Sequence, residues 1–184
     1  TDTHWRQEML LDTAAVICDT MGVTAATGMD YTVVPVERPF YGVYYGHAAV
    51  PLQPDTMYLL QSDLLAGCTT YLGDWDMETN QGVFRKLYDG VYDMERVDGA
   101  DMYEIYLSGS ESLLRIENPN ATTDRELIVF RDSYGGSLVP LLVQDYAVVT
   151  LVDIRTNYIL PERLGSFIEF NGQDVLFMYS SLVL

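Results

Sequence analysis

Glu126-Leu-Ile-Val-Phe-Arg-Asp-Ser-Tyr-Gly-Gly-Ser137 passes from a short apolar run into a turn with two glycines, and this transition decides the fold. Residues 126–130 are predicted to form a strand that is buried on both faces. Residues 137–146 suit a helix with Pro140 in its first turn, where proline is tolerated. The turn between strand and helix is expected to expose Ser133.

The same alternation of elements continues towards the end of the chain. Residues 147–154 read as a second buried strand, residues 160–170 as a helix, and residues 174–179 as a last strand. This order is typical of a parallel sheet with right-handed crossovers. Ligands of such sheets bind beyond the carboxyl ends of the strands, which is where Ser133 falls.

The first two thirds of the chain give a weaker pattern. Residues 6–21 have the apolar spacing of an amphipathic helix, with Gly22 at the position of a C-terminal cap. Residues 30–116 are rich in Tyr, Val, Gly and turn residues, and predict a β-rich insertion. Its strand-like runs are 31–36, 57–61 and 102–107, whereas 41–46 and 72–75 resemble loops or a substrate rim.

The first five residues, Thr1-Asp2-Thr3-His4-Trp5, supply the other parts of a possible catalytic triad. Serine is inert at neutral pH unless a base takes its proton, and a carboxylate can orient that base. In an extended segment, residues two apart share a face, so Asp2 could reach His4. We therefore consider Ser133 as nucleophile, His4 as base and Asp2 as the group that orients it.

Ordinary structural roles also explain each of these residues. Asp132 and Ser137 could simply stabilise a turn and cap a helix, and Asp2 could be a capping residue beside a surface histidine. The second histidine, His47, is expected in a loop, and Cys18 is expected in the core of the predicted helix. Only the combination of the two segments points to catalysis.

The order of the residues excludes one large class of serine enzymes. An α/β-hydrolase needs a G-x-S-x-G motif and a histidine after the serine. Here residues 131–135 read R-D-S-Y-G, and no histidine follows Ser133. The order Asp, His, Ser remains compatible with triad geometry, because that geometry recurs with different chain orders.

Composition narrows the choice of partners. The 27 acidic residues outnumber the 10 basic ones, for a net charge of −17, which argues against nucleic acids and anionic membrane surfaces. No zinc-protease, P-loop or Rossmann motif is present, so we expect no metal and no cofactor. The 184 residues are interpreted as a single domain, and a leader or anchor segment is expected outside it. The two cysteines, Cys18 and Cys68, leave the redox compartment open.

Several segments, in this order, resemble DHHW-type proteins, which are bacterial SGNH-hydrolase-like proteins related to the alginate O-acetyltransferases. The segments are Thr1–Trp5, Phe40–Gly46, Tyr103–Gly109, Leu127–Tyr134, Val152–Arg155 and Asp174–Tyr179. The resemblance covers nearly the whole chain. Thr3 stands where the name-giving motif has histidine, but it matches the alginate-acetylase version of that motif.

The resemblance implies an α/β fold: a flavodoxin-like, SGNH-type parallel sheet flanked by helices, with the β-rich insertion at about residues 30–116. It implies that the domain, residues 1–184, is a C-terminal portion of a longer protein. Asp2, His4 and Ser133 would be catalytic, and Tyr134, Gly109, Ser110 and Arg155 would bind substrate or the oxyanion. The family often has an Asn near Gly109, whereas this chain has Ser110. Arg155 could instead pair with Asp153.

The expected activity is a serine-dependent O-acetyltransferase or acetylesterase that acts on an extracytoplasmic polysaccharide or cell-envelope glycan through an acetyl-serine intermediate. The family relation also implies a membrane O-acyltransferase partner, and a secreted or membrane-anchored protein whose N-terminal region lies outside this chain. Two alternatives remain: a non-catalytic glycan-binding module with the same fold, and a purely structural envelope protein.

Overall fold

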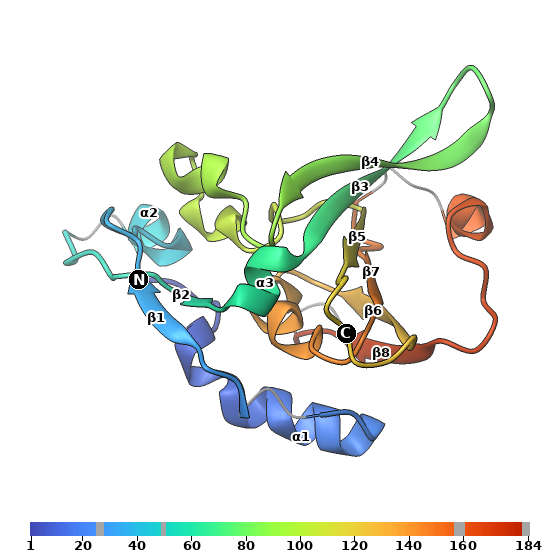
Figure 1. Cartoon of the computed structure of the whole chain (residues 1–184). Coiled ribbons are helices and arrows are strands. Elements are labelled where there is room, and N and C mark those ends of the chain that lie inside the picture. The colour runs from blue at the N-terminus through green and yellow to red at the C-terminus, as the bar shows by residue number, and fades with distance from the viewer. Residues whose placement is uncertain (25–27, 49–50, 157–160, 182–184) are drawn as a thin grey trace.

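The computed structural model describes residues 1–24, 28–48, 51–156 and 161–181, which form a mixed α/β fold (Figure 1). A sheet of six strands has the order β4-β3-β5-β7-β6-β8, and a second sheet pairs β1 with β2. No helix among the described residues is long and apolar enough to cross a membrane.

Three strands form the parallel part of the large sheet, as the sequence predicts: β6 (Glu126–Arg131), β7 (Val148–Val152) and β8 (Asp174–Met178). The connection from β6 to β7 contains α4 (Gly135–Leu138) and the 3-10 helix η5 (Val139–Leu142). The predicted helix over 137–146 thus begins two residues earlier and ends sooner. The connection to β8 contains the 3-10 helix η6 (Pro161–Ser166), within the predicted 160–170, whose first residue lies outside the described ranges.

The flavodoxin-like parallel sheet expected from the sequence is not confirmed for the other half, where strands from the expected β-rich insertion join the same sheet in antiparallel pairs. Strands β3 (Thr69–Asp76), β4 (Gln81–Asp89) and β5 (Leu113–Glu117) are antiparallel to their neighbours, and β5 joins them to β7. The short turn from β3 to β4 requires this, because a parallel pair needs a crossover of about a dozen residues or more. Residues 69–89 and 113–117 therefore extend the main sheet, and the expected loop at 72–75 lies inside β3.

The small sheet confirms two of the strand-like runs and corrects the third. β1 (Thr32–Pro35) pairs antiparallel with β2 (Tyr58–Gln61). The run at 102–107 instead contains the 3-10 helix η4 (Met102–Ile105), because the Asp101 side chain accepts a hydrogen bond from the Tyr103 N–H and starts a turn. The expected loop at 41–46 overlaps a short helix. The remaining elements here are α2 (Val43–Ala48), α3 (Asp63–Gly67) and the 3-10 helix η3 (Met94–Asp98).

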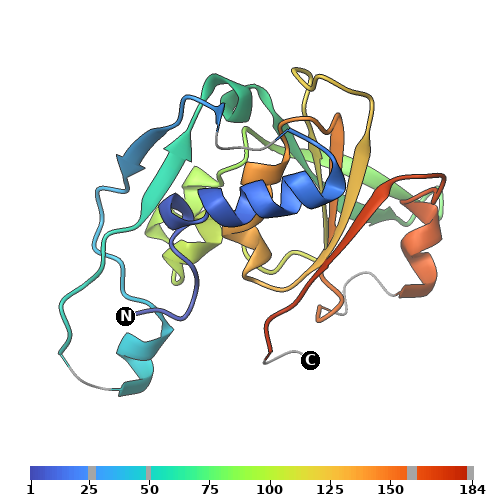
Figure 2. The same cartoon turned by 90° about the horizontal axis from the view of Figure 1, so that it is seen from below.

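The predicted N-terminal helix is confirmed, with a break near Leu10. It consists of the 3-10 helix η1 (Gln7–Met9) and α1 (Leu11–Met21), and Gly22 ends it in the left-handed conformation expected of a C-terminal cap. Figure 2 shows α1 lying across the sheet, where Ala14 and Cys18 are buried in the main core with Val129 of β6. Cys68 is buried in the same core, and the two cysteines do not form a disulfide. This packing fixes the first residues of the chain near the end of β6.

Candidate active site

Asp2 and His4 are joined by two hydrogen bonds in the N-terminal segment, which bends at Thr3 and His4 instead of being extended as the sequence suggested. The Asp2 Oδ1 atom lies 2.5 Å from His4 Nδ1 and accepts a bond of 2.7 Å from the His4 N–H. The second carboxylate oxygen accepts the N–H of Val43, at 3.0 Å. Burial opposes ionisation of Asp2, but the hydrogen bonds from His4 and Val43 prevail and lower the pKa of Asp2 to about 2. The carboxylate is therefore ionised and holds the proton of His4 on Nδ1.

The other ring nitrogen of His4 faces Ser133. Its Nε2 atom lies 2.9 Å from Ser133 Oγ, so an unprotonated Nε2 accepts the serine hydroxyl proton. The side chains of His4 and Asp2 are only 13% and 7% exposed, whereas Ser133 is half-buried. The structure thus brings Asp2, His4 and Ser133 into one line of hydrogen bonds.

Asp132 holds the turn that carries Ser133. Its carboxylate accepts the N–H of Tyr134 at 3.0 Å and that of Ser180, just beyond β8, at 2.6 Å. The turn then enters α4 through bonds from the Gly135 N–H to the Asp132 carbonyl and from the Gly136 N–H to the Ser133 carbonyl, both 3.1 Å. Ser133 is therefore fixed between two parallel strands and the first turn of a helix.

The two glycines after Tyr134 are required by close packing. A Cβ on Gly135 would lie 2.8 Å from Arg131 Cδ, and a Cβ on Gly136 would lie 3.0 Å from the carbonyl oxygen of Tyr106. The sequence predicted a tight glycine turn at Ser133, and a turn is found there. The main role of the two glycines is to let α4 pack closely against Arg131 and Tyr106.

Aromatic rings enclose the imidazole. Tyr134, one of the predicted site residues, donates a hydrogen bond of 3.1 Å to the Thr3 carbonyl, and its ring centroid is 5.1 Å from that of His4. Trp5 packs edge-on against Tyr134 at 5.0 Å. Tyr103 stacks on His4 with a centroid distance of 4.0 Å and an angle of 16°. Sequence reasoning missed Tyr103, because it placed that residue in a strand.

The structure does not join the other predicted site residues to Ser133. Gly109 is buried with a positive φ of 70°, packed so closely that a Cβ would meet the Glu104 side chain, and Ser110 is exposed. The Arg155 guanidinium binds the buried Asp153 carboxylate through two bonds, of 2.9 and 2.6 Å. This is the ion pair weighed from the sequence, and a role for Arg155 in the site stays a prediction.

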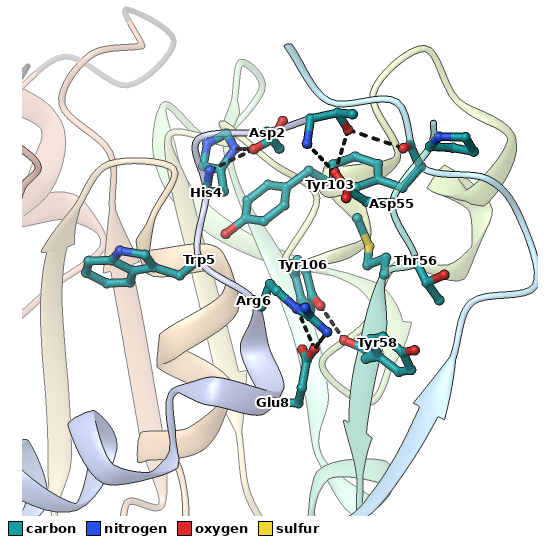
Figure 3. A pocket seen from close by; sticks show the side chains of 14 residues that line it. Asp2, His4, Trp5, Arg6, Glu8, Asp55, Thr56, Tyr58, Tyr103 and Tyr106 are labelled. Atoms are coloured by element: carbon teal, nitrogen blue, oxygen red, sulfur yellow. Dashed lines mark hydrogen bonds and ion pairs between the residues drawn. The ribbon is translucent and has the colours of Figure 1, made fainter. Parts of the chain in front are cut away.

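A pocket of about 470 Å³ opens on the Asp2 and His4 side of this arrangement (Figure 3). Arg6 lines this pocket, and its Nε atom donates a hydrogen bond of 2.7 Å to the Glu8 carboxylate. The Thr1 hydroxyl donates to Asp55 on the opposite wall, at 2.6 Å. Most lining residues were not singled out from the sequence. The complete lining, which includes the predicted Asp2 and His4, consists of Thr1, Asp2, His4, Trp5, Arg6, Glu8, Phe40, Pro54, Asp55, Thr56, Met57, Tyr58, Tyr103 and Tyr106.

Within the described part of the chain, no group of three or more His, Cys, Asp or Glu side chains is arranged to hold a metal ion.

Comparison with known proteins gives matches in three-dimensional structure alone. No protein-family model and no curated protein sequence matches the chain. A DHHW family protein from Eubacterium siraeum is 26% identical with a TM-score of 0.71, over 97% of this chain and 57% of that one. Bacillus cereus PatB1, in a structure with a sulfonyl adduct, is 21% identical with a TM-score of 0.68, over 98% of this chain and 59% of its own. A further structure of PatB1 is 21% identical with a TM-score of 0.67, over 98% of this chain and 61% of that one.

This chain therefore spans about six tenths of the length of the solved structures that it resembles. The similarity in fold to a DHHW family protein agrees with the resemblance found in the sequence, and supports a relation to DHHW-type proteins.

Proposed function

We propose that this chain contains the catalytic site of a serine-dependent O-acetyltransferase or acetylesterase. The observation that carries the proposal is the continuous line of hydrogen bonds from Asp2 through His4 to Ser133. The 2.9 Å between His4 Nε2 and Ser133 Oγ lies within the range that proton transfer requires, about 2.6 to 3.2 Å between heavy atoms. A carboxylate, an imidazole and a serine in this order are the parts of an acyl-transfer site.

The reaction would begin when Ser133 Oγ attacks the carbonyl carbon of an acetyl donor and its proton passes to His4 Nε2. The ionised Asp2 then stabilises the imidazolium that forms. When the tetrahedral intermediate collapses, the bond to the leaving group breaks, and His4 returns the proton to that group. An acetyl ester on Ser133 remains.

The second half of the reaction would use the same proton path in reverse. His4 takes a proton from a sugar hydroxyl or from water, whose oxygen attacks the acetyl ester. The ester bond to Ser133 Oγ then breaks, and His4 returns the proton to that oxygen. The acceptor decides between transfer and hydrolysis. The backbone N–H of Ser133 has no acceptor among the described residues, so it is available to bind the developing oxyanion.

The proposed substrate is a polysaccharide or cell-envelope glycan outside the cytoplasm, which accepts the acetyl group in transfer and carries it in hydrolysis. Aromatic and polar side chains mix in the pocket beside His4, a composition suited to sugar rings with many hydroxyl groups. We further propose a membrane O-acyltransferase partner that supplies acetyl groups, as the resemblance of the sequence to the alginate O-acetyltransferases implies. The net charge of −17 disfavours nucleic acids as ligands.

Hydrolysis of p-nitrophenyl acetate tests the proposal, because an acetyl-serine can be resolved by water even when a sugar is the natural acceptor. We expect slow turnover by the wild type, with loss to the background rate in Ser133→Ala. Ser166→Ala is the matched control, because Ser166 is an exposed serine of η6. Equal turnover in Ser133→Ala and wild type would exclude Ser133 as the nucleophile. A folded wild type without any turnover would favour the non-catalytic glycan-binding alternative.

A further inference from the structure

We propose that Tyr103 is a positioning residue for His4, which sets the tilt of the imidazole and anchors it to the helix that follows Ser133. The inference rests on the proposed function and extends it to a residue outside the Asp2, His4 and Ser133 line. It arises from two contacts of one buried side chain, which is only 5% exposed.

The first contact is the ring stack. The Tyr103 and His4 centroids are 4.0 Å apart, with 16° between the ring planes. The hydrogen bonds of His4 to Asp2 and Ser133 lie at two nitrogens, Nδ1 and Nε2. These two bonds fix a line through the imidazole but leave rotation about that line open. A parallel ring packed on one face removes this freedom.

The second contact joins Tyr103 to the nucleophile turn. Its hydroxyl donates a hydrogen bond of 2.9 Å to Ser137 Oγ, and Ser137 is fully buried in α4. The Ser137 hydroxyl in turn donates to the Tyr134 carbonyl, at 3.4 Å. One side chain therefore contacts the base directly and contacts the helix that begins two residues after Ser133.

The protonation state of Tyr103 agrees with a positioning role. Burial is the main cause that raises the pKa of Tyr103 above its usual value. The phenol therefore keeps its proton at neutral pH and acts as a hydrogen-bond donor. Its ring face also favours the imidazolium that forms when His4 accepts the Ser133 proton, because aromatic faces attract cations.

The competing explanation is that Tyr103 only fills the core. It packs in a buried cluster with Phe40, Met57 and Ile105. A residue with that role alone would change stability without a selective effect on the acylation chemistry. Ile105 is a matched control, because it is fully buried in the same 3-10 helix and cluster and lies outside the pocket lining.

The experiment compares Tyr103→Phe, Tyr103→Leu and Ile105→Ala by melting temperature and by p-nitrophenyl acetate kinetics. We expect kcat to fall several-fold in Tyr103→Phe, which keeps the stack and loses the anchor. It should fall by about 10- to 100-fold in Tyr103→Leu, with KM nearly unchanged, because small misplacements of a catalytic group are costly. Ile105→Ala should melt at a lower temperature but keep kcat within about twofold. Tyr103 variants that lose stability and keep kcat would overturn the proposal.

A second measurement does not depend on turnover. The chain has two histidines, so the Cε1–H signals of His4 and His47 can be assigned in an NMR spectrum with a His47→Gln variant. We expect the His4 signal to show the upfield ring-current shift of a stacked imidazole, and to lose it in Tyr103→Leu. An unchanged signal would overturn the positioning role even if the esterase activity were absent. Absent activity with the expected shift would count against the proposed function alone.

Discussion

The side-chain amide of Gln7 donates a hydrogen bond of 3.0 Å to the carbonyl oxygen of Ser137, 130 residues along the chain. Gln7 is fully buried, and its amide oxygen also accepts the Leu60 N–H at 2.9 Å and the Tyr92 hydroxyl at 2.8 Å. A single glutamine thus ties the segment that carries Asp2 and His4 to the helix behind Ser133 and to β2.

Replacing Gln7 by alanine is expected to lower the free energy of unfolding by about 2–4 kcal/mol, because each buried group left without its partner costs about 1–3 kcal/mol. Urea unfolding measures this loss. Gln61→Ala is the control, since Gln61 is an exposed glutamine of β2 and should change stability by less than about 0.5 kcal/mol. Equal stabilities for the two variants would show that the Gln7 hydrogen bonds do not hold the N-terminal segment.

The lowered pKa of Asp2 predicts an acid-sensitive contribution to stability. Its folded pKa of about 2 lies below the ordinary value of 3.8, so the folded state favours the ionised carboxylate. The stabilisation is fully present above about pH 4 and is lost as the pH falls through about 2. Comparing wild type with Asp2→Asn at several pH values isolates this group from other carboxylates.

We expect the difference in unfolding free energy between wild type and Asp2→Asn to be constant above about pH 4 and to shrink towards pH 2. The esterase activity of Asp2→Asn should be low at every pH, because Asp2 orients His4. A stability difference that does not change between pH 4 and pH 2 would contradict the hydrogen-bonded, ionised Asp2.

The buried guanidinium of Arg131 does not have hydrogen-bond partners for all of its nitrogen atoms among the described residues. It is fully buried, and its Nε and Nη2 atoms have no hydrogen-bond partner among the described residues. Burial is the main cause that lowers the pKa of Arg131. Arg131→Met should therefore leave the free energy of unfolding unchanged or raise it by about 1–4 kcal/mol, as apolar replacements of buried charges can do.

Arg125→Met serves as the comparison for Arg131. The Arg125 guanidinium binds the carbonyls of Met21 and Gly22 and the Asp174 carboxylate, so its loss should cost about 1 kcal/mol or more. If thermal unfolding shows that Arg131→Met is the more damaging change, Arg131 has a stabilising role that the described contacts do not explain.

The ion pair between Arg155 and Asp153 predicts that a substitution of Arg155 changes stability without changing turnover. Arg155→Lys keeps the charge but cannot reproduce the two-bond contact, so we expect a loss of about 1 kcal/mol in stability. If the guanidinium serves this ion pair alone, turnover of p-nitrophenyl acetate stays within about twofold. A large loss of turnover at unchanged stability would instead support the role in the site expected from the sequence.

The edge strand β8 exposes Val175 and Phe177, but β6 and β7 could be predicted because most of their residues are buried, on both faces of the sheet. Val129 and Val149 are fully buried, and such strands leave near-continuous apolar runs in the sequence. The antiparallel half could not, because β3 and β4 are mostly half-exposed and mix Tyr, Trp, Asp and Gly. Their direction depends on the short turn between them rather than on a residue pattern.

The candidate site shows a similar division. Asp2, His4 and Ser133 could be proposed from the sequence, because an Asp-x-His pair and a serine at the end of a strand together supply the parts of an acyl-transfer site. Tyr103 and Gln7 could not, since tyrosine and glutamine have many ordinary roles. Their significance comes from contacts with His4 and Ser137, which arise only when distant parts of the chain pack together.

The most direct test of the central claim, that His4 activates Ser133 as a nucleophile, is covalent labelling with phenylmethylsulfonyl fluoride followed by mass spectrometry. Ser133 Oγ would form a bond to sulfur while the sulfur–fluorine bond breaks, fluoride leaves, and the hydroxyl proton passes to His4. We expect one sulfonyl group per wild-type chain, mapped to Ser133, none in Ser133→Ala, and labelling about 100-fold slower or more in His4→Gln. Labelling at another residue, or an equal rate in wild type and His4→Gln, would contradict the account.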